Sequence, residues 1–300
     1  MALLLSCLRG RAAEFAGPLE ERDFTAAARA FQDLNYDRAQ REFGVFVKTW
    51  TNSAFKAEAV LRQAQSRYFQ TNSVGAVELL TAGLPRAGSW AEEYQFWLAE
   101  AQFQAGKYAA AANTYALLVR DFPQSPHLLA AAYNEVLARH RLGDQREKVI
   151  ALLRSPDGAF QRAAQAAPAD TLVTSGTLLL GEVLLAGQEW AAAEKAVRAL
   201  DQPTLPPEVE WQRGFLLGRV LAAADRPADA LPVATNLVRL AGMLKQPLQL
   251  AEAFALQGAV LEKLGNLSAA VTSLTNNFST NTPPELRQRA LTKAVELSLA

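Results

Sequence analysis

Apolar and small residues recur along this chain at helical spacing, in pairs of segments separated by short turns. The clearest pair lies between residues 94 and 126, YQFWLAEAQFQAGKYAAAANTYALLVRDFPQSP. Gly106 divides its two stretches, and Pro123 closes the second. Glycine takes the left-handed backbone that ends a helix at little cost, and proline cannot continue a helix. The pattern therefore predicts two helices joined by a tight turn.

Similar pairs precede and follow this one. Small residues such as Ala99, Gly218 and Gly258 let the two helices of a pair approach closely. In the second helix, the residue four positions after an alanine packs onto the next pair, because positions i and i+4 share a helix face. The predicted pairs, with a last unpaired helix, are 24–31 with 36–50; 57–69 with 74–81; the two helices of 94–126; 127–142 with 146–153; 172–186 with a return through Trp190, Ala193 and Val197; 208–224 with Ala230, Ala234 and Leu237; 250–264 with Leu267, Ala270 and Leu274; and 285–299 alone.

The order of large, small, glycine, aromatic, alanine, aromatic and proline resembles the tetratricopeptide (TPR) repeat. It is carried by Leu98, Ala99, Gly106, Tyr108, Ala111, Tyr115 and Pro123. Such a unit cannot bury its apolar face alone and needs stacked neighbours. We expect an all-α, right-handed TPR superhelical solenoid of about seven helix–turn–helix units and one unpaired last helix. The alternative is a non-repeating α-helical bundle with coincidental alanine spacing.

The spacing of the units predicts an interruption. After Gly143 the next turn comes late, and the intervening 155–170, SPDGAFQRAAQAAPAD, holds a turn and a short helix that Pro168 ends. We therefore divide the chain into an N-terminal segment 1–22, a first TPR sub-array 23–154, a break or linker 155–170 and a second sub-array 171–300.

The N-terminal segment has two readings. Its apolar residues before Ser6 and Cys7 resemble the end of a secretory signal, and Leu4–Cys7 fit a bacterial lipoprotein cleavage box in which Cys7 is the lipidation candidate. However, no basic residue precedes the apolar run, which is shorter than the usual 7–15 or so residues. Residues 1–22 are thus either the remnant of a signal or lipoprotein peptide or a mildly apolar, unstructured start.

Composition argues against several functions. Thirty basic and thirty acidic residues cancel, which gives no electrostatic reason to expect nucleic acid. Cys7 is the only cysteine, and His127 and His140 fit no metal-binding pattern. Phosphate-loop, dinucleotide and serine-nucleophile motifs are absent from the sequence. We expect no catalysis, no cofactor, no metal, no small-molecule substrate, and contact with a membrane only through a lipid anchor.

The resemblance to TPR proteins indicates where partners bind, because the first helices of a TPR array line its concave surface. The candidates at these positions are Tyr68, Phe96, Phe103, Tyr133, Phe215 and Arg219. Aromatic residues in a groove suit an extended peptide or a partner helix. The alternative is that they fill gaps between neighbouring first helices. The carboxylate clamp of chaperone-binding TPR domains, which needs Lys, Asn and Arg there, is not supported.

Residues 24–143 resemble the TPR regions of bacterial envelope proteins, namely the Tol–Pal system TPR protein and the TPR lipoprotein of the outer-membrane β-barrel assembly machinery. The matching residues are Tyr36, Ala39, Phe43, Phe46, Gly106, Tyr108, Ala111, Tyr115 and 122–126 (FPQSP). The resemblance implies a non-catalytic periplasmic scaffold that recruits protein or peptide partners. The alternatives are a cytoplasmic location and a helical accessory or regulatory part of a longer protein.

Overall fold

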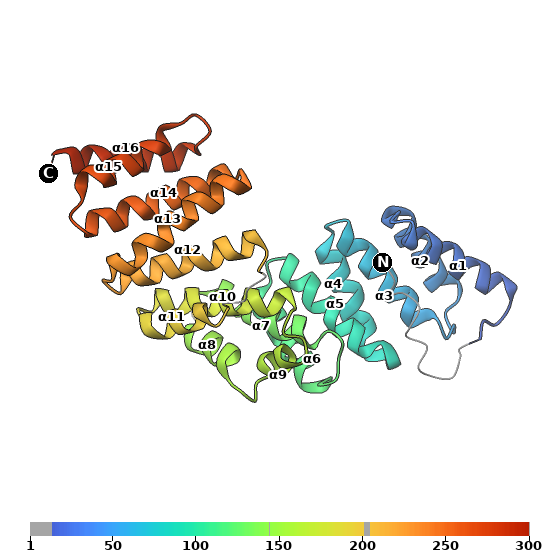
Figure 1. The fold of residues 1–300 in the computed structure, drawn as a ribbon. Helices are drawn as coiled ribbons and strands as arrows, with labels where there is room; N and C mark the ends of the chain where they lie inside the picture. Colours follow the sequence, from blue (N-terminus) through green and yellow to red (C-terminus); the bar gives the residue numbers. More distant parts are fainter. Residues whose placement is uncertain (1–13, 144, 201–204, 300) are drawn as a thin grey trace. The chain divides into compact units, whose positions relative to one another are not determined.

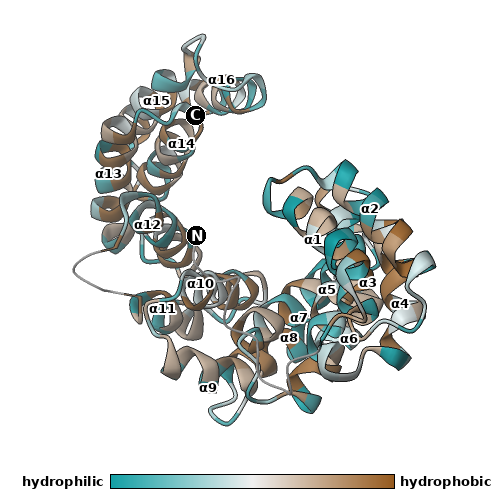
Figure 2. Ribbon diagram, turned by 90° about the vertical axis from the view of Figure 1, so that its right-hand side faces the viewer, coloured by the Kyte–Doolittle hydropathy of each residue, from teal (hydrophilic) through white to brown (hydrophobic). Residues whose placement is uncertain are grey.

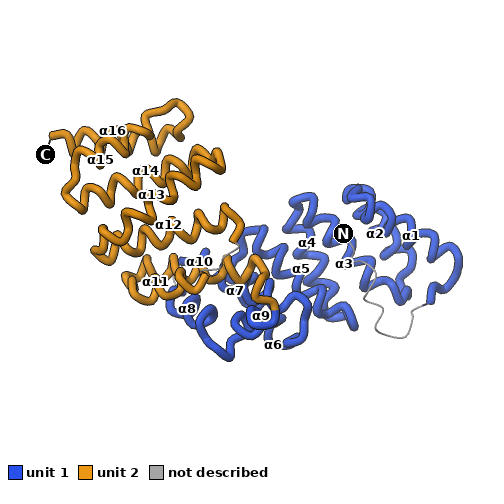
Figure 3. Tube along the Cα trace, in the orientation of Figure 1, with its two compact units in different colours: residues 1–166 blue, residues 167–300 orange. Residues whose placement is uncertain are grey.

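The computed structural model describes residues 14–143, 145–200 and 205–299. These residues form helices and turns, with no β-strand among them (Figure 1). The chain divides into two compact units, Met1–Ala166 (unit 1) and Ala167–Ala300 (unit 2), coloured separately in Figure 3. Cys7 lies outside the described residues, so its lipidation stays a prediction.

Unit 1 is a series of antiparallel helix pairs. Its α-helices are α1 (Pro18–Gln32), α2 (Tyr36–Thr49), α3 (Lys56–Phe69), α4 (Ser73–Gly83), α5 (Ala91–Gln104), α6 (Tyr108–Asp121), α7 (Leu128–Leu142), α8 (Arg146–Arg154) and α9 (Ala159–Ala166), with the short 3₁₀ turns η1 (Leu84–Arg86) and η2 (Gly88–Trp90) before α5. Each second helix packs on its own first helix, and α2, α4 and α6 also pack on the first helix that follows. The short helix α9 packs on α7 and α8.

Small residues form the interior of the pairs in unit 1. Ala99 of α5, Ala111 of α6 and Ala131 of α7 are fully buried in one cluster with Tyr115. Tyr115 of α6 reaches the following helix α7, as the spacing of alanine and aromatic residue predicts. Tyr94 joins α5 to α3 because its hydroxyl donates to the backbone carbonyl of Ala57 at 2.7 Å.

Unit 2 repeats the arrangement. Its elements are α10 (Thr171–Ala186), α11 (Trp190–Arg198), α12 (Pro207–Ala223), α13 (Pro227–Leu244), α14 (Pro247–Lys263), α15 (Leu267–Thr275), the 3₁₀ turn η3 (Asn276–Phe278) and α16 (Pro284–Leu299). The first helices contact one another, α10 with α12 and α12 with α14. Figure 2 shows α13 and α15 on the other side of this row. The last helix, α16, packs on α15 and α14.

Glycines bring helices together in unit 2, although not always within one pair. A Cβ atom on Gly258 would lie 2.9 Å from Leu274 of the paired helix α15, as the sequence predicts. On Gly218 it would lie 2.8 Å from Leu256 of α14, the next first helix, and 3.6 Å from Val233 of the paired helix. Gly218 therefore serves mainly the contact between neighbouring helix pairs, because the first helices of consecutive pairs lie against each other.

The helix pairs predicted from the sequence are confirmed. In the turn between α10 and α11 the left-handed residue is Gln188, with a φ of 62°, whereas Gly187 has a φ of −87°. The left-handed residue is set by where the last helical hydrogen bond falls, so it lies one position beyond the glycine.

Candidate binding surface

A chain of touching rings crosses the first helices of unit 1. We call it the aromatic surface and define it by Phe31, Tyr36, Tyr68, Phe69, Phe96, Trp97 and the ring of His127. Phe69 of α3 is its centre, with ring centroids 4.7 Å from Tyr36, 5.5 Å from Tyr68 and 5.6 Å from Trp97. Phe96 continues the chain from Trp97 and stacks on His127 at 4.0 Å. Rings that touch in this way are pre-organised for binding.

A cavity of about 260 Å³ opens on this surface. It is lined by Phe31, Gln32, Leu34, Tyr36, Arg62, Gln65, Phe69 and Trp97. Phe69 remains 43% exposed and Leu34 68% exposed, so the lining presents large apolar groups to solvent. Helical register places these residues together, since Arg62 and Phe69 lie two turns apart on α3 and share a face.

Arg62 is the cation of the cavity. Its guanidinium carbon lies 5.4 Å from the centroid of the Phe31 ring. One nitrogen donates to Gln65 at 3.2 Å, and another lies 3.5 Å from Glu58. Its positive charge is thus already shared between an aromatic face and a carboxylate.

Glu93 of α5 contacts the aromatic surface at the end where His127 lies. Its carboxylate lies 2.9 Å from Nε2 of His127 and accepts from the Trp97 indole N–H at 3.2 Å. Burial alone would raise the pKa of Glu93, but the hydrogen bond and charge of His127, helped by Trp97, outweigh burial and lower it. Glu93 is therefore an ionised group that orients two rings.

Glu100, two turns beyond Glu93 on α5, is bound only by neutral groups among the described residues. Its Oε1 accepts from the Tyr115 hydroxyl at 2.5 Å and from the Asn134 amide at 2.8 Å. Its Oε2 receives only the Tyr68 hydroxyl, at a long 3.4 Å. Burial, with Glu100 adding to it, raises the pKa of Tyr68 to about 12 and also raises that of Tyr115. Both phenols therefore stay protonated and donate.

The structure brings two of the residues predicted from the sequence into the aromatic surface, Tyr68 and Phe96. Phe103 instead packs edge-on against Tyr108 within its own helix pair, with centroids 5.2 Å apart. Tyr133 is partly buried on α7. Phe215 and Arg219 lie in unit 2, on α12.

Sequence reasoning missed most of the surface. Phe31 and Phe69 lie at helix ends, Trp97 follows Phe96, and Arg62 lies in the middle of α3. The repeat signature includes none of these four, and it includes Tyr36 only as a structural position. One signal was present: the run of rings at 68–69 and 96–97 places two aromatic residues side by side on successive first helices.

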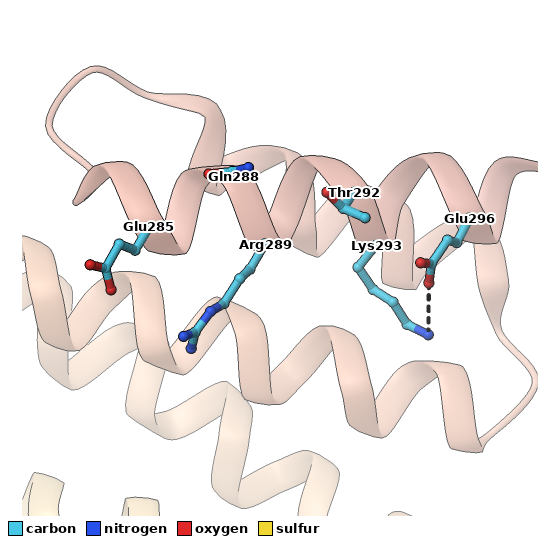
Figure 4. A pocket seen from close by; sticks show the side chains of 6 residues that line it. All are labelled: Glu285, Gln288, Arg289, Thr292, Lys293 and Glu296. Atoms are coloured by element: carbon cyan, nitrogen blue, oxygen red, sulfur yellow. Dashed lines mark ion pairs between the residues drawn. The ribbon is translucent and has the colours of Figure 1, made fainter.

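A wider depression runs along α16 and is lined by Glu285, Gln288, Arg289, Thr292, Lys293 and Glu296 (Figure 4). Its volume is about 520 Å³, twice that of the aromatic cavity. All its lining side chains are polar and come from one helix, and Lys293 is paired with Glu262 at 2.8 Å. We place the candidate site at the smaller cavity, because it joins apolar groups from several helices and the depression along α16 does not.

The described part of the chain holds no group of three His, Cys, Asp or Glu side chains that could bind a metal ion. None of its helices is long and apolar enough to cross a membrane.

Comparison with known proteins agrees with this architecture. Residues 93–125 match the family model described as tetratricopeptide repeat. No curated protein matches the chain. A crystal structure of a tetratricopeptide repeat protein from Parabacteroides merdae superposes with a TM-score of 0.58 over 93% of this chain and 100% of that one, at 12% identity. The fold is a TPR solenoid.

A second structural match is the crystal structure of BtubC (BKLC) from P. vanneervenii. It has a TM-score of 0.52 and 16% identity, and covers 77% of this chain and 94% of that one. Identities this low support the fold alone. The similarity of 24–143 to envelope TPR proteins therefore stays a prediction.

Proposed function

We propose that this TPR solenoid is a non-catalytic scaffold that binds a polypeptide segment of a protein partner on the aromatic surface of unit 1. The observation that carries the proposal is the cavity between Phe31, Phe69 and Trp97. Its volume of about 260 Å³ lies below the roughly 300–1,000 Å³ of small-molecule pockets. The cavity instead suits one large apolar side chain, with the rest of the segment lying across neighbouring helices.

The energetics of interfaces favour this assignment. Tryptophan, tyrosine and arginine are the residues that dominate binding energy when they lie at the centre of an interface, and Trp97, Tyr36 and Arg62 all line the cavity. The rings are held by contacts with one another. Little side-chain entropy is therefore lost when a partner covers them.

Phage-displayed random peptides selected on the immobilised protein test the proposal. We expect the enriched peptides to share a large apolar residue. Phe69→Ala and Trp97→Ala should each weaken their binding by about tenfold or more, because each truncation removes a central contact worth roughly 1–2 kcal/mol or more. Phe215→Ala, on unit 2, is the matched control and should leave binding unchanged.

Two outcomes contradict the proposal. Either selection enriches no peptide that binds in solution, or the enriched peptides bind Phe69→Ala and Trp97→Ala as tightly as the wild type. Circular dichroism melts of each variant separate a lost contact from a lost fold.

We also propose that the protein works in a bacterial cell envelope, with Cys7 carrying a lipid anchor. The support is the similarity of 24–143 to envelope TPR proteins and the apolar run before Cys7. Labelling with a tritiated fatty acid in the native cell should mark the wild type but not Cys7→Ser, and only the wild type should sediment with membranes. An unlabelled wild type would exclude the anchor. The alternative of an accessory part of a longer protein is tested by the reading frame beyond Ala300.

A further inference from the structure

The carboxylate of Glu100 has no partner of opposite charge among the described residues. Its three hydrogen-bond donors, Tyr68, Tyr115 and Asn134, are all neutral. A carboxylate withdrawn from water still attracts a cation strongly, because the surrounding protein screens charge less than water does. Its Oε2 has only the long contact with Tyr68, so one acceptor remains weakly used.

The surroundings of Glu100 are aromatic and acidic. The Tyr68 ring, whose hydroxyl reaches Glu100, also touches the Trp97 ring at 5.4 Å. Rings beside a carboxylate form a favourable environment for a guanidinium or ammonium group. The carboxylates of this face are Glu58, Glu93 and Glu100. Arg62 pairs with Glu58 and His127 pairs with Glu93, whereas Glu100 has no such partner among the described residues. The face is thus net negative on a chain whose total charge is zero.

From this charge complementarity we infer that the partner segment is basic, and that its arginine or lysine binds Glu100 beside Tyr68 and Trp97. The inference rests on the proposed function, since the apolar side chain of the same segment occupies the cavity. The two subsites adjoin: Trp97, which lines the cavity, and Glu100 are three residues apart on α5, which places their Cβ atoms roughly 5–6 Å apart. That separation suits a basic residue two positions from the apolar one in an extended segment.

Two phage-displayed peptide libraries, one with all amino acids and one lacking Arg and Lys, test the inference. We expect the first to yield peptides with a basic residue two positions from the apolar one, and the second to yield none. For a fluorescent copy of the best peptide, Glu100→Gln should weaken binding about tenfold, as expected for loss of a hydrogen bond to a charged group. Replacing the peptide's basic residue by Gln should have the same effect.

The two changes together should cost little more than either alone, because they remove the same contact. Binding to the wild type should also weaken as salt is raised, and Glu100→Gln should remove that dependence. Glu78→Gln, an exposed carboxylate on the second helix α4, is the charge-matched control and should bind like the wild type. Glutamine keeps an acceptor for Tyr115 and Asn134, so the melting temperature of Glu100→Gln should stay close to that of the wild type.

The outcomes separate this inference from the proposed function. Tight-binding peptides without a basic residue, or full affinity in Glu100→Gln, would overturn the inference. The proposed function would stand in that case if Trp97→Ala still weakened binding. If Trp97→Ala and Phe69→Ala were also without effect, or no peptide bound, both the inference and the proposed function would fail.

Discussion

The first helices of both units carry aromatic and charged residues, but the contacts that these side chains make differ between the units. In unit 1 the rings of four helices touch and leave a cavity, and the carboxylate of Glu100 has only neutral partners in the part of the chain that the structure describes. In unit 2 Trp211 and Phe215 stack on each other within α12 at 4.8 Å, and Arg219 pairs with Glu182 at 2.8 Å. The same helical frame thus pairs Arg219 with a carboxylate in unit 2 and leaves the carboxylate of Glu100 without a cationic partner among the described residues of unit 1.

The tryptophans of the two first-helix rows separate these roles most strongly. Trp211 is 4% exposed, so Trp211→Ala should destabilise unit 2 by about 3–5 kcal/mol, the usual cost of an emptied aromatic site. Trp97→Ala, at a partly exposed site, should cost about 1–2 kcal/mol and mainly weaken peptide binding. Urea unfolding followed by circular dichroism, together with peptide affinity, measures both effects.

Trp211→Phe sharpens this prediction. The buried indole N–H of Trp211 has no hydrogen-bond partner among the described residues, so removing it should offset part of the lost packing. We expect Trp211→Phe to be less costly than Trp211→Ala by about 2 kcal/mol or more. Equal losses in the two variants would show that the indole itself is indispensable there. If Trp211→Ala abolished peptide binding and Trp97→Ala left it intact, the assignment of binding to unit 1 and of internal packing to unit 2 would be wrong.

A few residues show how much of the fold and of the candidate site can be predicted from the sequence. Ala111, Tyr115 and Gly106 follow one another at fixed spacing, so local periodicity predicts the helices, their turns and their buried faces. The aromatic surface joins Phe31, Phe69, Trp97 and His127, which no short-range pattern connects. Their contact depends on how far each first helix is shifted along the next, and that shift results from packing. For the same reason Tyr68 and Phe96 could be predicted as candidates, but their connection through Trp97 could not.

The ionised forms of two glutamates should affect stability in opposite directions. The pKa of Glu93 in unit 1 is lowered: burial opposes this, but His127 and Trp97 outweigh it. Its contribution to stability is therefore present at neutral pH and is lost as pH falls through the folded-state pKa. The pKa of Glu252 in unit 2 is raised, chiefly by burial, with Arg219 acting against that. Its ionised form costs stability at neutral pH, and this cost disappears as pH falls through the folded-state pKa.

Glu93→Gln should therefore lower stability at neutral pH and Glu252→Gln should raise it slightly. Both effects should be about 1 kcal/mol or less, because neither group is fully buried. Both differences from the wild type should shrink in acid. Melting temperatures between neutral pH and about pH 3 measure them. A stabilised Glu93→Gln, or differences that grow in acid, would show that the two environments are not opposed.

The smallest expected effects lie in the turns, where the two units are alike. Thr71 in unit 1 and Gln188 in unit 2 have φ values of 62°, a left-handed conformation that costs a side-chain-bearing residue roughly 1–2 kcal/mol. Glycine avoids that cost but loses more freedom on folding, so Thr71→Gly and Gln188→Gly should each stabilise by about 0.5–1 kcal/mol. Gly106→Thr is the reverse test: a Cβ atom there meets nothing within 4 Å, so any loss reflects its φ of 73° alone. Matching gains at Thr71 and Gln188 in calorimetric melts would show that the turns are equivalent and that the units differ only on their first-helix faces. A gain in stability in one unit alone would mean that its turn is coupled to the neighbouring surface. Thr71 is the candidate for such coupling, because it lies two residues from Phe69 of the aromatic surface.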